Sequence, residues 1–450
     1  MPPSDSGSLD TIVALATPFG RSAIALLRLS GSEARRILGA LAPSLPPRIP
    51  ARRPTLAELR DADGEAVDRA LVTLFPAPAS FTGEDVAELT VHGSPAVIAV
   101  VLAAAVAAGA RPARPGEFTE RAFRNGKLDL VRAEAVRDLI EARTPRAARA
   151  SLARLEGALS DRFRRVREDL LAASAGLTAA IDFSEDAGEA VPADVASRLA
   201  SAELALDRLA RSYGAGRLLS AGCRVAILGR PNAGKSTLFN ALAGSARAIV
   251  TDVPGTTRDA LEAELDLGGI PVTVIDTAGL RETEDLVESL GVARARAEAD
   301  RADAIVYVYD ASRGLAPDEE AELAASAKPR VLVANKIDRA GGPLAADAEP
   351  LCGLAPDAGE KLRRWLAACV ASGVAIEEAS EVLGSIRQRD LALRAHDAAA
   401  RAGASLARGD SPEYAAAHCT EALAALADLV GETTPDDVLA RVFETFCIGK

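Results

Sequence analysis

The sequence predicts a multidomain protein of 450 residues, in which an α+β N-terminal domain is followed by helical blocks that flank an α/β P-loop domain. Short β-like runs alternate with two helical runs up to about residue 120. Long helical periodicity fills residues 127–211 and returns at 376–446, and strand and helix patterns alternate between these blocks. The pattern favours one helical domain that the α/β domain interrupts, because the ends of an inserted domain usually lie close together; two separate helical domains are the alternative.

The N-terminal domain contains four β-like runs, at residues 11–16, 24–29, 70–75 and 86–91. The apolar run at residues 96–108 is too short and too rich in Ala to span a membrane, so we expect a buried helix there. The polar start of the chain predicts no signal peptide.

The first helical block is rich in Ala, Leu and Arg, and its periodicity breaks near residues 183–186 and at Pro192. Gly214, Gly216 and Gly222 then indicate the entry to the α/β domain. Two interpretations of this block's arginines stay open. They contact RNA phosphates, or they lie on a solvated helix and pair with acids such as Glu156, Asp161 and Glu168. The arginines are residues 143, 146, 149, 154, 162, 164, 165 and 167.

A phosphate-binding loop is predicted at residues 229–236, with the sequence Gly-Arg-Pro-Asn-Ala-Gly-Lys-Ser. It follows the apolar run 223–228 and precedes a helical pattern, which is the strand–loop–helix context that such a loop requires. Gly229 and Gly234 allow the backbone to approach phosphates closely. Lys235 would neutralise phosphate charge and Ser236 would hold Mg²⁺.

Two further motifs follow in the expected order. Asp-Thr-Ala-Gly at residues 276–279 follows a strand pattern. Its aspartate can provide a carboxylate on the magnesium side, and the amide of its glycine can contact the γ-phosphate. Asn-Lys-Ile-Asp at 335–338 follows the apolar run 331–334. Asp338 can accept hydrogen bonds from N1 and N2 of guanine, and adenine offers no such pair. The sequence therefore predicts a GTP-binding domain.

Ras-like GTPases place a glutamine directly after Asp-x-x-Gly, and it orients the attacking water. Leu280 occupies that position here. GTP hydrolysis by this chain requires another catalytic group. One candidate is a monovalent cation held by Asn232 and by the oxygen-rich segment 251–259, which would supply positive charge at the phosphates. The alternative is Arg258 as an arginine finger in cis, although the adjacent Asp259 is well placed to engage it.

These motifs together resemble the MnmE (TrmE) family of tRNA modification GTPases. The resemblance covers the whole chain and includes Gly-Thr-Thr-Arg-Asp at residues 255–259, the terminal Phe-Cys-Ile-Gly-Lys at 446–450, and N-terminal motifs. The N-terminal motifs lie at residues 11–13, 17–18, 20–21, 81–85, 92–93 and 114–118.

The resemblance implies a fold with three parts: an α+β folate-binding domain, a single α-helical domain, and a Ras-like α/β P-loop GTPase domain inserted into it. The implied boundaries are 1–121 for the folate-binding and dimerising domain, 122–215 for the first helical part, 216–373 for the TrmE-type G domain, and 374–450 for the second helical part with its tail.

The resemblance also implies a function. The family's members are potassium-dependent GTPases that work with a flavin-binding MnmG-type partner. They add a carboxymethylaminomethyl or aminomethyl group to C5 of the wobble uridine of certain tRNAs, using a folate one-carbon unit. We accordingly expect a cytoplasmic homodimer without a membrane segment. An Era-like RNA or ribosome assembly GTPase, a switch without modifying activity, is the alternative, but such switches lack the N-terminal domain and the terminal pentapeptide.

Matched by position, the G domain has implied ligands for GTP, Mg²⁺ and K⁺. K⁺ would be held by Asn232, Thr251, Val253 and Thr256, and Mg²⁺ by Ser236 and Thr257. Glu288 would position the attacking water in place of the missing glutamine; a solvated helical glutamate is the alternative. The residues implied to contact GTP are Asn232, Ala233, Gly234, Lys235, Ser236, Thr237, Thr251, Asp252, Val253, Pro254, Gly255, Thr256, Thr257, Asp276, Thr277, Ala278, Gly279, Asn335, Lys336 and Asp338.

A second implied site binds 5-formyltetrahydrofolate or a related folate. Its matched residues are Arg28, Glu88, Lys127 and Lys450. A glutamate can pair with the aminopyrimidine edge of a pterin, and Arg and Lys suit carboxylate or formyl oxygens. The tail would place Cys447 near this chemistry, as a nucleophile or as a residue that only positions the tail.

Composition constrains the partners. The net charge of −12 argues against unspecific polyanion binding over the whole surface, so any RNA must meet a local basic patch. An aromatic content of 3% provides no extended base-stacking platform. The five scattered cysteines suit reduced thiols. One departure from the family pattern lies at residues 352–359, where Cys-Gly-Leu replaces the expected Ser-Ala-Lys-like loop that supports guanine.

Overall fold

The computed structural model describes residues 10–182, 191–245, 262–276, 297–371 and 381–450. The chain forms two compact units. The first unit comprises Met1–Arg137, Leu155–Ala196 and Arg401–Lys450, and the second comprises Asp138–Arg154 and Ser197–Ala400. An α+β domain, a large helical part and an α/β P-loop domain are all present, so the predicted fold class is confirmed. The individual domain boundaries remain a prediction.

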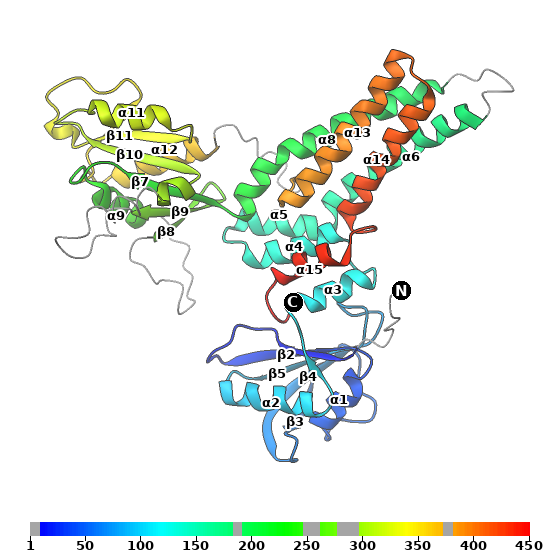
Figure 1. Cartoon of the computed structure of the whole chain (residues 1–450). Coiled ribbons are helices and arrows are strands. Elements are labelled where there is room, and N and C mark those ends of the chain that lie inside the picture. The colour runs from blue at the N-terminus through cyan, green and yellow to red at the C-terminus, as the bar shows by residue number, and fades with distance from the viewer. Residues whose placement is uncertain (1–9, 183–190, 246–261, 277–296, 372–380) are drawn as a thin grey trace. The chain divides into compact units, whose positions relative to one another are not determined.

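The first unit begins with a six-stranded sheet in the order β3-β4-β5-β2-β1-β6. Only the β1–β6 pair is parallel among the paired strands of this sheet. Helices α1 (Ala34–Leu41) and α2 (Pro95–Ala107) bury their apolar side chains against the sheet (Figure 1). The strands are β1 (Ile12–Leu15), β2 (Ile24–Ser30), β3 (Thr55–Arg60), β4 (Ala66–Phe75), β5 (Val86–His92) and β6 (Arg111–Pro112).

Helix α2 corresponds to the apolar run that was expected to be a buried helix. Pro95 stands at its start, where the missing N–H costs nothing. Ile98 and Val101 are buried in the core while Val106 is exposed, so the helix packs with one side on the sheet. Among the described residues, no helix is long and apolar enough to cross a membrane. Strands β3 and β6 were not predicted, because a short or weakly alternating segment becomes a strand only through its partner.

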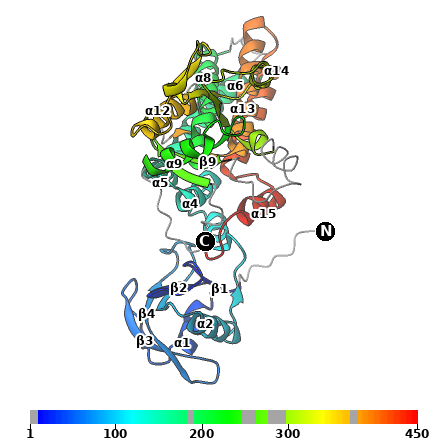
Figure 2. The ribbon, with the colours of Figure 1, turned by 90° about the vertical axis from the view of Figure 1, so that its left-hand side faces the viewer.

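The rest of the first unit is mainly helical. It contains α3 (Glu117–Arg124), most of α4 (Leu130–Glu141), α6 (Ala158–Asp182), α14 (Pro412–Val430) and α15 (Asp436–Glu444). Helices α6 and α14 lie side by side in both views (Figures 1 and 2), although more than 200 residues separate them in the chain. The break predicted near residues 183–186 lies outside the described residues, whereas the break predicted at Pro192 agrees with the start of α8 (Ala193–Ser220) at the next residue.

The second unit contains a six-stranded sheet in the order β12-β11-β10-β7-β9-β8. All its pairs are parallel except β8–β9. Helices α9 (Lys235–Ser245) and α12 (Ala358–Ala371) pack on one face, and α11 (Pro317–Ala325) packs on the other. The strands are β7 (Cys223–Leu228), β8 (Glu262–Leu267), β9 (Ile270–Asp276), β10 (Ala304–Asp310), β11 (Arg330–Asn335) and β12 (Ala348–Leu351).

Most of α5 (Pro145–Glu156), α8 (Ala193–Ser220) and α13 (Ile386–Arg408) also belongs to the second unit. The prediction that three glycines mark the entry to the α/β domain was wrong for two of them. Gly214 and Gly216 lie inside α8, and only Gly222 leaves it, with φ +79°. Gly216 is needed for close packing instead, since a Cβ there would clash with the carbonyl of Leu383.

Candidate nucleotide and folate sites

The P-loop connects the end of β7 to the start of α9, as predicted. Gly229 has φ +134°, and a Cβ on it would clash with the carbonyl oxygen of Val308 on the neighbouring strand. Gly234 has φ +98°, and a Cβ there would meet the amide of Asn335. Both positions therefore require glycine for the backbone path that wraps around phosphates.

Lys235 is the buried cation of this loop. Its Nζ donates hydrogen bonds to the carbonyl oxygens of Gly229 and Arg230, each at 2.8 Å. These bonds hold the ammonium group within the loop, where the β- and γ-phosphates of a nucleotide would lie. Ser236 and Thr237 follow in the first turn of α9, where the positive end of the helix favours an anion. Ala233 is buried beneath the loop. The residues present fit a nucleoside triphosphate.

Asn335 connects the base-recognition motif to the P-loop. Its Nδ2 donates to the carbonyl of Ala233 at 2.8 Å, and its Oδ1 accepts from the N–H of Gly353 at 2.9 Å. The side chain is buried at the end of β11, so both of its polar ends are satisfied in the protein. One amide thus fixes the P-loop and the loop after β12 relative to each other.

Lys336 and Asp338 complete this motif. Lys336 adopts a left-handed conformation, and its Nζ donates to the carbonyl of Asn232 and pairs with Asp310, each at 2.7 Å. Burial alone would raise the pKa of Asp310, but hydrogen bonds from Lys336 and Ser312 lower it to about 2. Asp338 lies in the short 3-10 helix Ile337–Arg339 with its carboxylate about half exposed, accessible to a base.

The unusual loop at residues 352–359 follows strand β12. Because β12 pairs in parallel with β11, Leu351 lies level with Asn335 and the loop begins beside the base-recognition motif. The bond from Gly353 to Asn335 anchors it there. Leu354, the third residue of this loop, is 82% exposed. The loop therefore begins beside the base-recognition motif, and its role in supporting guanine stays a prediction.

Asp276 ends β9 as predicted and is buried, level with Ile227 of the strand that leads into the P-loop. Asn232 is exposed at the tip of the loop with φ +63°. The remaining predicted residues of this site lie outside the described residues: Thr251, Asp252, Val253, Pro254, Gly255, Thr256, Thr257, Thr277, Ala278, Gly279 and Glu288. Leu280 and Arg258 lie outside them as well.

The N-terminal site is built around an ion pair on neighbouring strands. Arg28 on β2 and Glu88 on β5 are direct cross-strand partners, and Arg28 Nη2 lies 2.7 Å from Glu88 Oε1. The guanidinium carbon of Arg28 also lies 5.7 Å from the ring centroid of Phe118 and 5.9 Å from that of Phe81. Aromatic rings thus flank a half-buried charged pair, which suits a flat heteroaromatic ligand with polar edges.

The C-terminal tail returns to this site. The N–H of Phe118 donates to the carbonyl of Lys450 at 3.2 Å, and the N–H of Gly116 donates to that of Cys447 at 3.4 Å. Gly449 has φ +92° and packs so closely on Leu15 that a Cβ would clash with its carbonyl.

Lys450 is half-buried beside the ion pair. Burial lowers the pKa of its ammonium group, the charge of Arg28 lowers it further, and the charge of Glu88 opposes the shift. The structure therefore brings Arg28, Glu88 and Lys450 together. Lys127 makes a different contact, from its Nζ to the carbonyl of Pro78 at 3.1 Å. Cys447 is exposed.

Sequence reasoning missed the aromatic side chains of this site. Phe81 and Phe118 lie in motifs that carried the resemblance, but no residue pattern indicated that both would face Arg28. The role of Asn335 as a link between loops was also not predicted. Both relationships join segments that are distant in the chain, and motif spacing carries no signal for such contacts.

Comparison with known proteins identifies two family models. The model described as "GTP-binding protein TrmE N-terminus" matches residues 11–127, and the "MnmE helical domain" model matches residues 130–447. A protein of Azoarcus sp. named "tRNA modification GTPase MnmE" is 45% identical, with 98% of both chains covered. A protein of Roseiflexus sp. with the same name is 42% identical and covers 98% of this chain and 99% of its own.

Among solved structures, Aquifex aeolicus Era bound to GDP and AlF4- is 24% identical, covering 39% of this chain and 66% of that chain with a TM-score of 0.26. So low a TM-score supports no functional conclusion. The two family models and the full-length relatives, taken with the P-loop geometry, show that the chain is a GTP hydrolase and belongs to the MnmE family of tRNA modification GTPases.

Proposed function

We propose that this protein is a potassium-dependent GTPase that acts with a FAD-binding MnmG-type partner. Together they would add a carboxymethylaminomethyl or aminomethyl group to C5 of the wobble uridine of certain tRNAs, using a folate one-carbon unit. The observation that carries the proposal is the N-terminal site, where Arg28 and Glu88 meet the chain's own terminal Lys450. A GTPase that acts only as a switch has no use for such a site.

In the G domain, Lys235 would neutralise charge on the β- and γ-phosphates. Mg²⁺ would be held by Ser236 and Thr257, with Asp276 on the same side of the metal. The sequence places no glutamine after the Asp-x-x-Gly motif. Other groups must therefore position the attacking water and supply positive charge at the phosphates. K⁺ would supply the charge through Asn232, Thr251, Val253 and Thr256, and Glu288 would position the water.

At the N-terminal site, Glu88 would pair with the aminopyrimidine edge of the folate, while Arg28 and Lys450 would contact its acidic or formyl oxygens. The folate supplies a one-carbon unit when bound. Phe118 and Phe81 would flank its ring. Lys127 would contribute from the adjoining loop. The exposed thiol of Cys447 would lie close to this chemistry, as a nucleophile or as a tail-positioning residue.

The proposed assembly is a homodimer in the cytoplasm that joins the MnmG-type partner in a heterotetramer and receives tRNA. Two measurements test the proposal. GTP turnover should be strongly faster in KCl than in NaCl at equal ionic strength, and 5-formyltetrahydrofolate should bind the protein, with loss of affinity in Glu88→Gln. GTP hydrolysis with no response to K⁺ would point to Arg258 or an external activator. RNA binding without folate binding or modifying activity would favour an Era-like assembly switch.

A further inference from the structure

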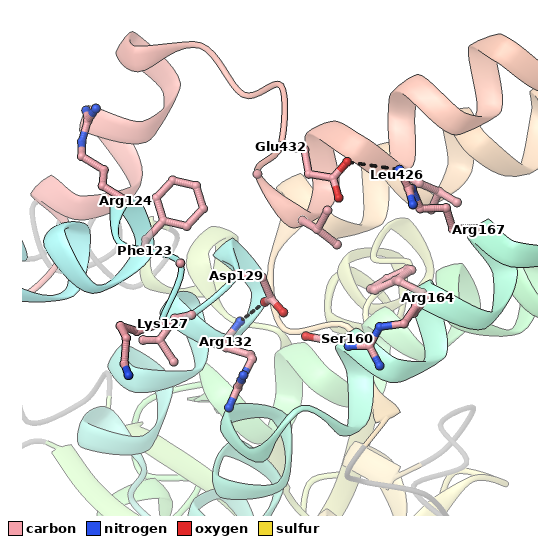
Figure 3. A pocket seen from close by; sticks show the side chains of 15 residues that line it. Phe123, Arg124, Lys127, Asp129, Arg132, Ser160, Arg164, Arg167, Leu426 and Glu432 are labelled. Carbon is pink, nitrogen blue, oxygen red and sulfur yellow. Dashed lines mark hydrogen bonds and ion pairs between the residues drawn. The ribbon is translucent and has the colours of Figure 1, made fainter. Parts of the chain in front are cut away.

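A basic pocket lies in the first unit between the turn after α3, the start of α6 and the end of α14 (Figure 3). Its volume is about 640 Å³. Its lining includes two acidic residues, Asp129 and Glu432, and more basic ones, in a chain whose net charge is −12. Arg124 pairs with Glu120 and Asp436, and Arg167 pairs with Glu432 across the pocket, so the lining keeps a smaller excess of positive charge on a mostly acidic protein. The basic residues are Arg124, Lys127, Arg132, Arg164 and Arg167.

Ser160 is an unpartnered polar group in this pocket. Its side chain is 5% exposed, and its hydroxyl has no hydrogen-bond partner within the part of the chain that the structure describes. It belongs to the first turn of α6, where the helix dipole favours negative charge. Buried hydroxyl groups normally have a hydrogen-bond partner. The missing partner of Ser160 therefore points to a ligand that accepts a hydrogen bond from this hydroxyl. The charge of the surroundings indicates an anionic oxygen.

Arg164 lies one turn after Ser160 on the same face of α6 (Figure 3). Its Nη1 pairs with Asp161 at 2.7 Å, and both side chains are more than half exposed. Such a surface ion pair is weak and can be exchanged for a phosphate. Arg132 is held in place by a bond from its Nε to the carbonyl of Leu155 at 2.8 Å. Arg132 and Arg164 thus line the same pocket as Ser160.

The α3 side of the pocket carries two apolar side chains beside its charged ones. Phe123 and Leu128 line it, and the ring of Phe123 packs against Gly431, where a Cβ would lie 2.6 Å from the ring. A volume of about 640 Å³ with apolar side chains in its lining exceeds what a lone phosphate needs. A nucleotide unit has both a phosphate for the basic side and a sugar or base for the apolar side.

We propose that this pocket binds one nucleotide unit of an RNA strand, with the phosphate on Ser160 and Arg164 and the sugar or base against Phe123 and Leu128. The proposal rests on the proposed function, in which this chain receives tRNA. The proposal also divides the arginines of the first helical block into those that line the pocket and those that do not. Arg164 and Arg167 line the pocket and Arg165, beside them on α6, does not.

The test uses fluorescence anisotropy of a labelled tRNA transcript with the full-length protein. Arg164→Glu should weaken binding about tenfold at low salt and reduce the slope of log K against log salt by about 0.7 to 0.9. The matched control Arg165→Glu makes the same charge change at an exposed neighbouring position and should stay within about twofold of the wild type. Ser160→Ala should weaken binding a few-fold without lowering the unfolding temperature, because its hydroxyl bonds to no described residue. GTP turnover should be the same in all four proteins.

Equal tRNA affinity of Arg164→Glu and Arg165→Glu, with Ser160→Ala at wild-type affinity, would overturn the pocket proposal and leave the proposed function intact. Failure of the wild type itself to bind tRNA, with GTP turnover present, would instead remove both. A further measurement is the effect of inorganic phosphate alone on the unfolding temperature. If it raises the unfolding temperature of the wild type but not of Ser160→Ala, while tRNA affinity is unchanged in every variant, the pocket holds a small anion and the RNA assignment is wrong.

Discussion

The side-chain amide of Asn335 donates a hydrogen bond to the backbone carbonyl of Ala233, 2.8 Å away in the P-loop. The same side chain accepts from Gly353, so a single buried amide joins the phosphate loop, the base-recognition motif and the loop after β12. We therefore expect the phosphate and base ends of the nucleotide site to respond together to changes at this residue.

Asn335→Asp should weaken GTP and GDP binding by about tenfold or more, roughly 1.4 kcal/mol, because a carboxylate cannot donate to the Ala233 carbonyl. Titration with a fluorescent GDP analogue measures the affinity. Asn240→Asp is the control, since it makes the same change at an exposed position of α9. Wild-type affinity in Asn335→Asp would show that the link does not support the site.

Gly229→Ala should destabilise the second unit by roughly 2 kcal/mol or more, because the added Cβ meets the Val308 carbonyl and φ is +134°. Gly244→Ala, in open space on α9, should stabilise it by about 0.5–1 kcal/mol. The only tryptophan, Trp365, packs against the core of this unit, so its fluorescence during urea unfolding reports both changes. Equal midpoints for the two variants would contradict the geometry.

Glu117→Gln should lower the stability of the first unit at neutral pH. Burial alone would raise the pKa of Glu117, but hydrogen bonds from Arg111, Arg114 and Arg121 lower it to about 2 from the usual 4.5. A depressed folded-state pKa contributes stability that is complete above the usual value and is lost as the pH falls toward about 2.

The expected loss at pH 7 is on the order of 3 kcal/mol, and it should shrink steadily below about pH 4.5. Urea unfolding followed by far-UV circular dichroism at pH 7 and pH 3 measures it. Glu33→Gln, which removes only an exposed pair with Arg36, should change stability by less than about 0.5 kcal/mol. A pH-independent difference between Glu117→Gln and the wild type would refute the charge explanation.

Cys447 should react with a maleimide faster than the other four thiols. It is exposed in the tail, whereas burial raises the pKa of Cys223 to about 12 and that of Cys419 to about 11. Only the thiolate reacts, so these two buried groups should label last. Peptide mapping by mass spectrometry after brief labelling gives the order, with Cys447→Ser as the control. Rapid labelling of Cys419 would mean that the helices around it open in solution.

The sequence alone determined the parts of this protein that depend on local geometry. Glycine spacing and strand–loop–helix periodicity located the P-loop between β7 and α9, and the apolar run that became α2 was recognisable from its composition. Only the tertiary structure decided which distant segments meet. Phe118 bonds to Lys450, Arg28 faces Glu88, and Ser160 opens into a pocket whose far side is the end of α14. Such contacts depend on which faces of helices and strands pack together, and that choice is made by the combined burial of many side chains rather than by any one motif.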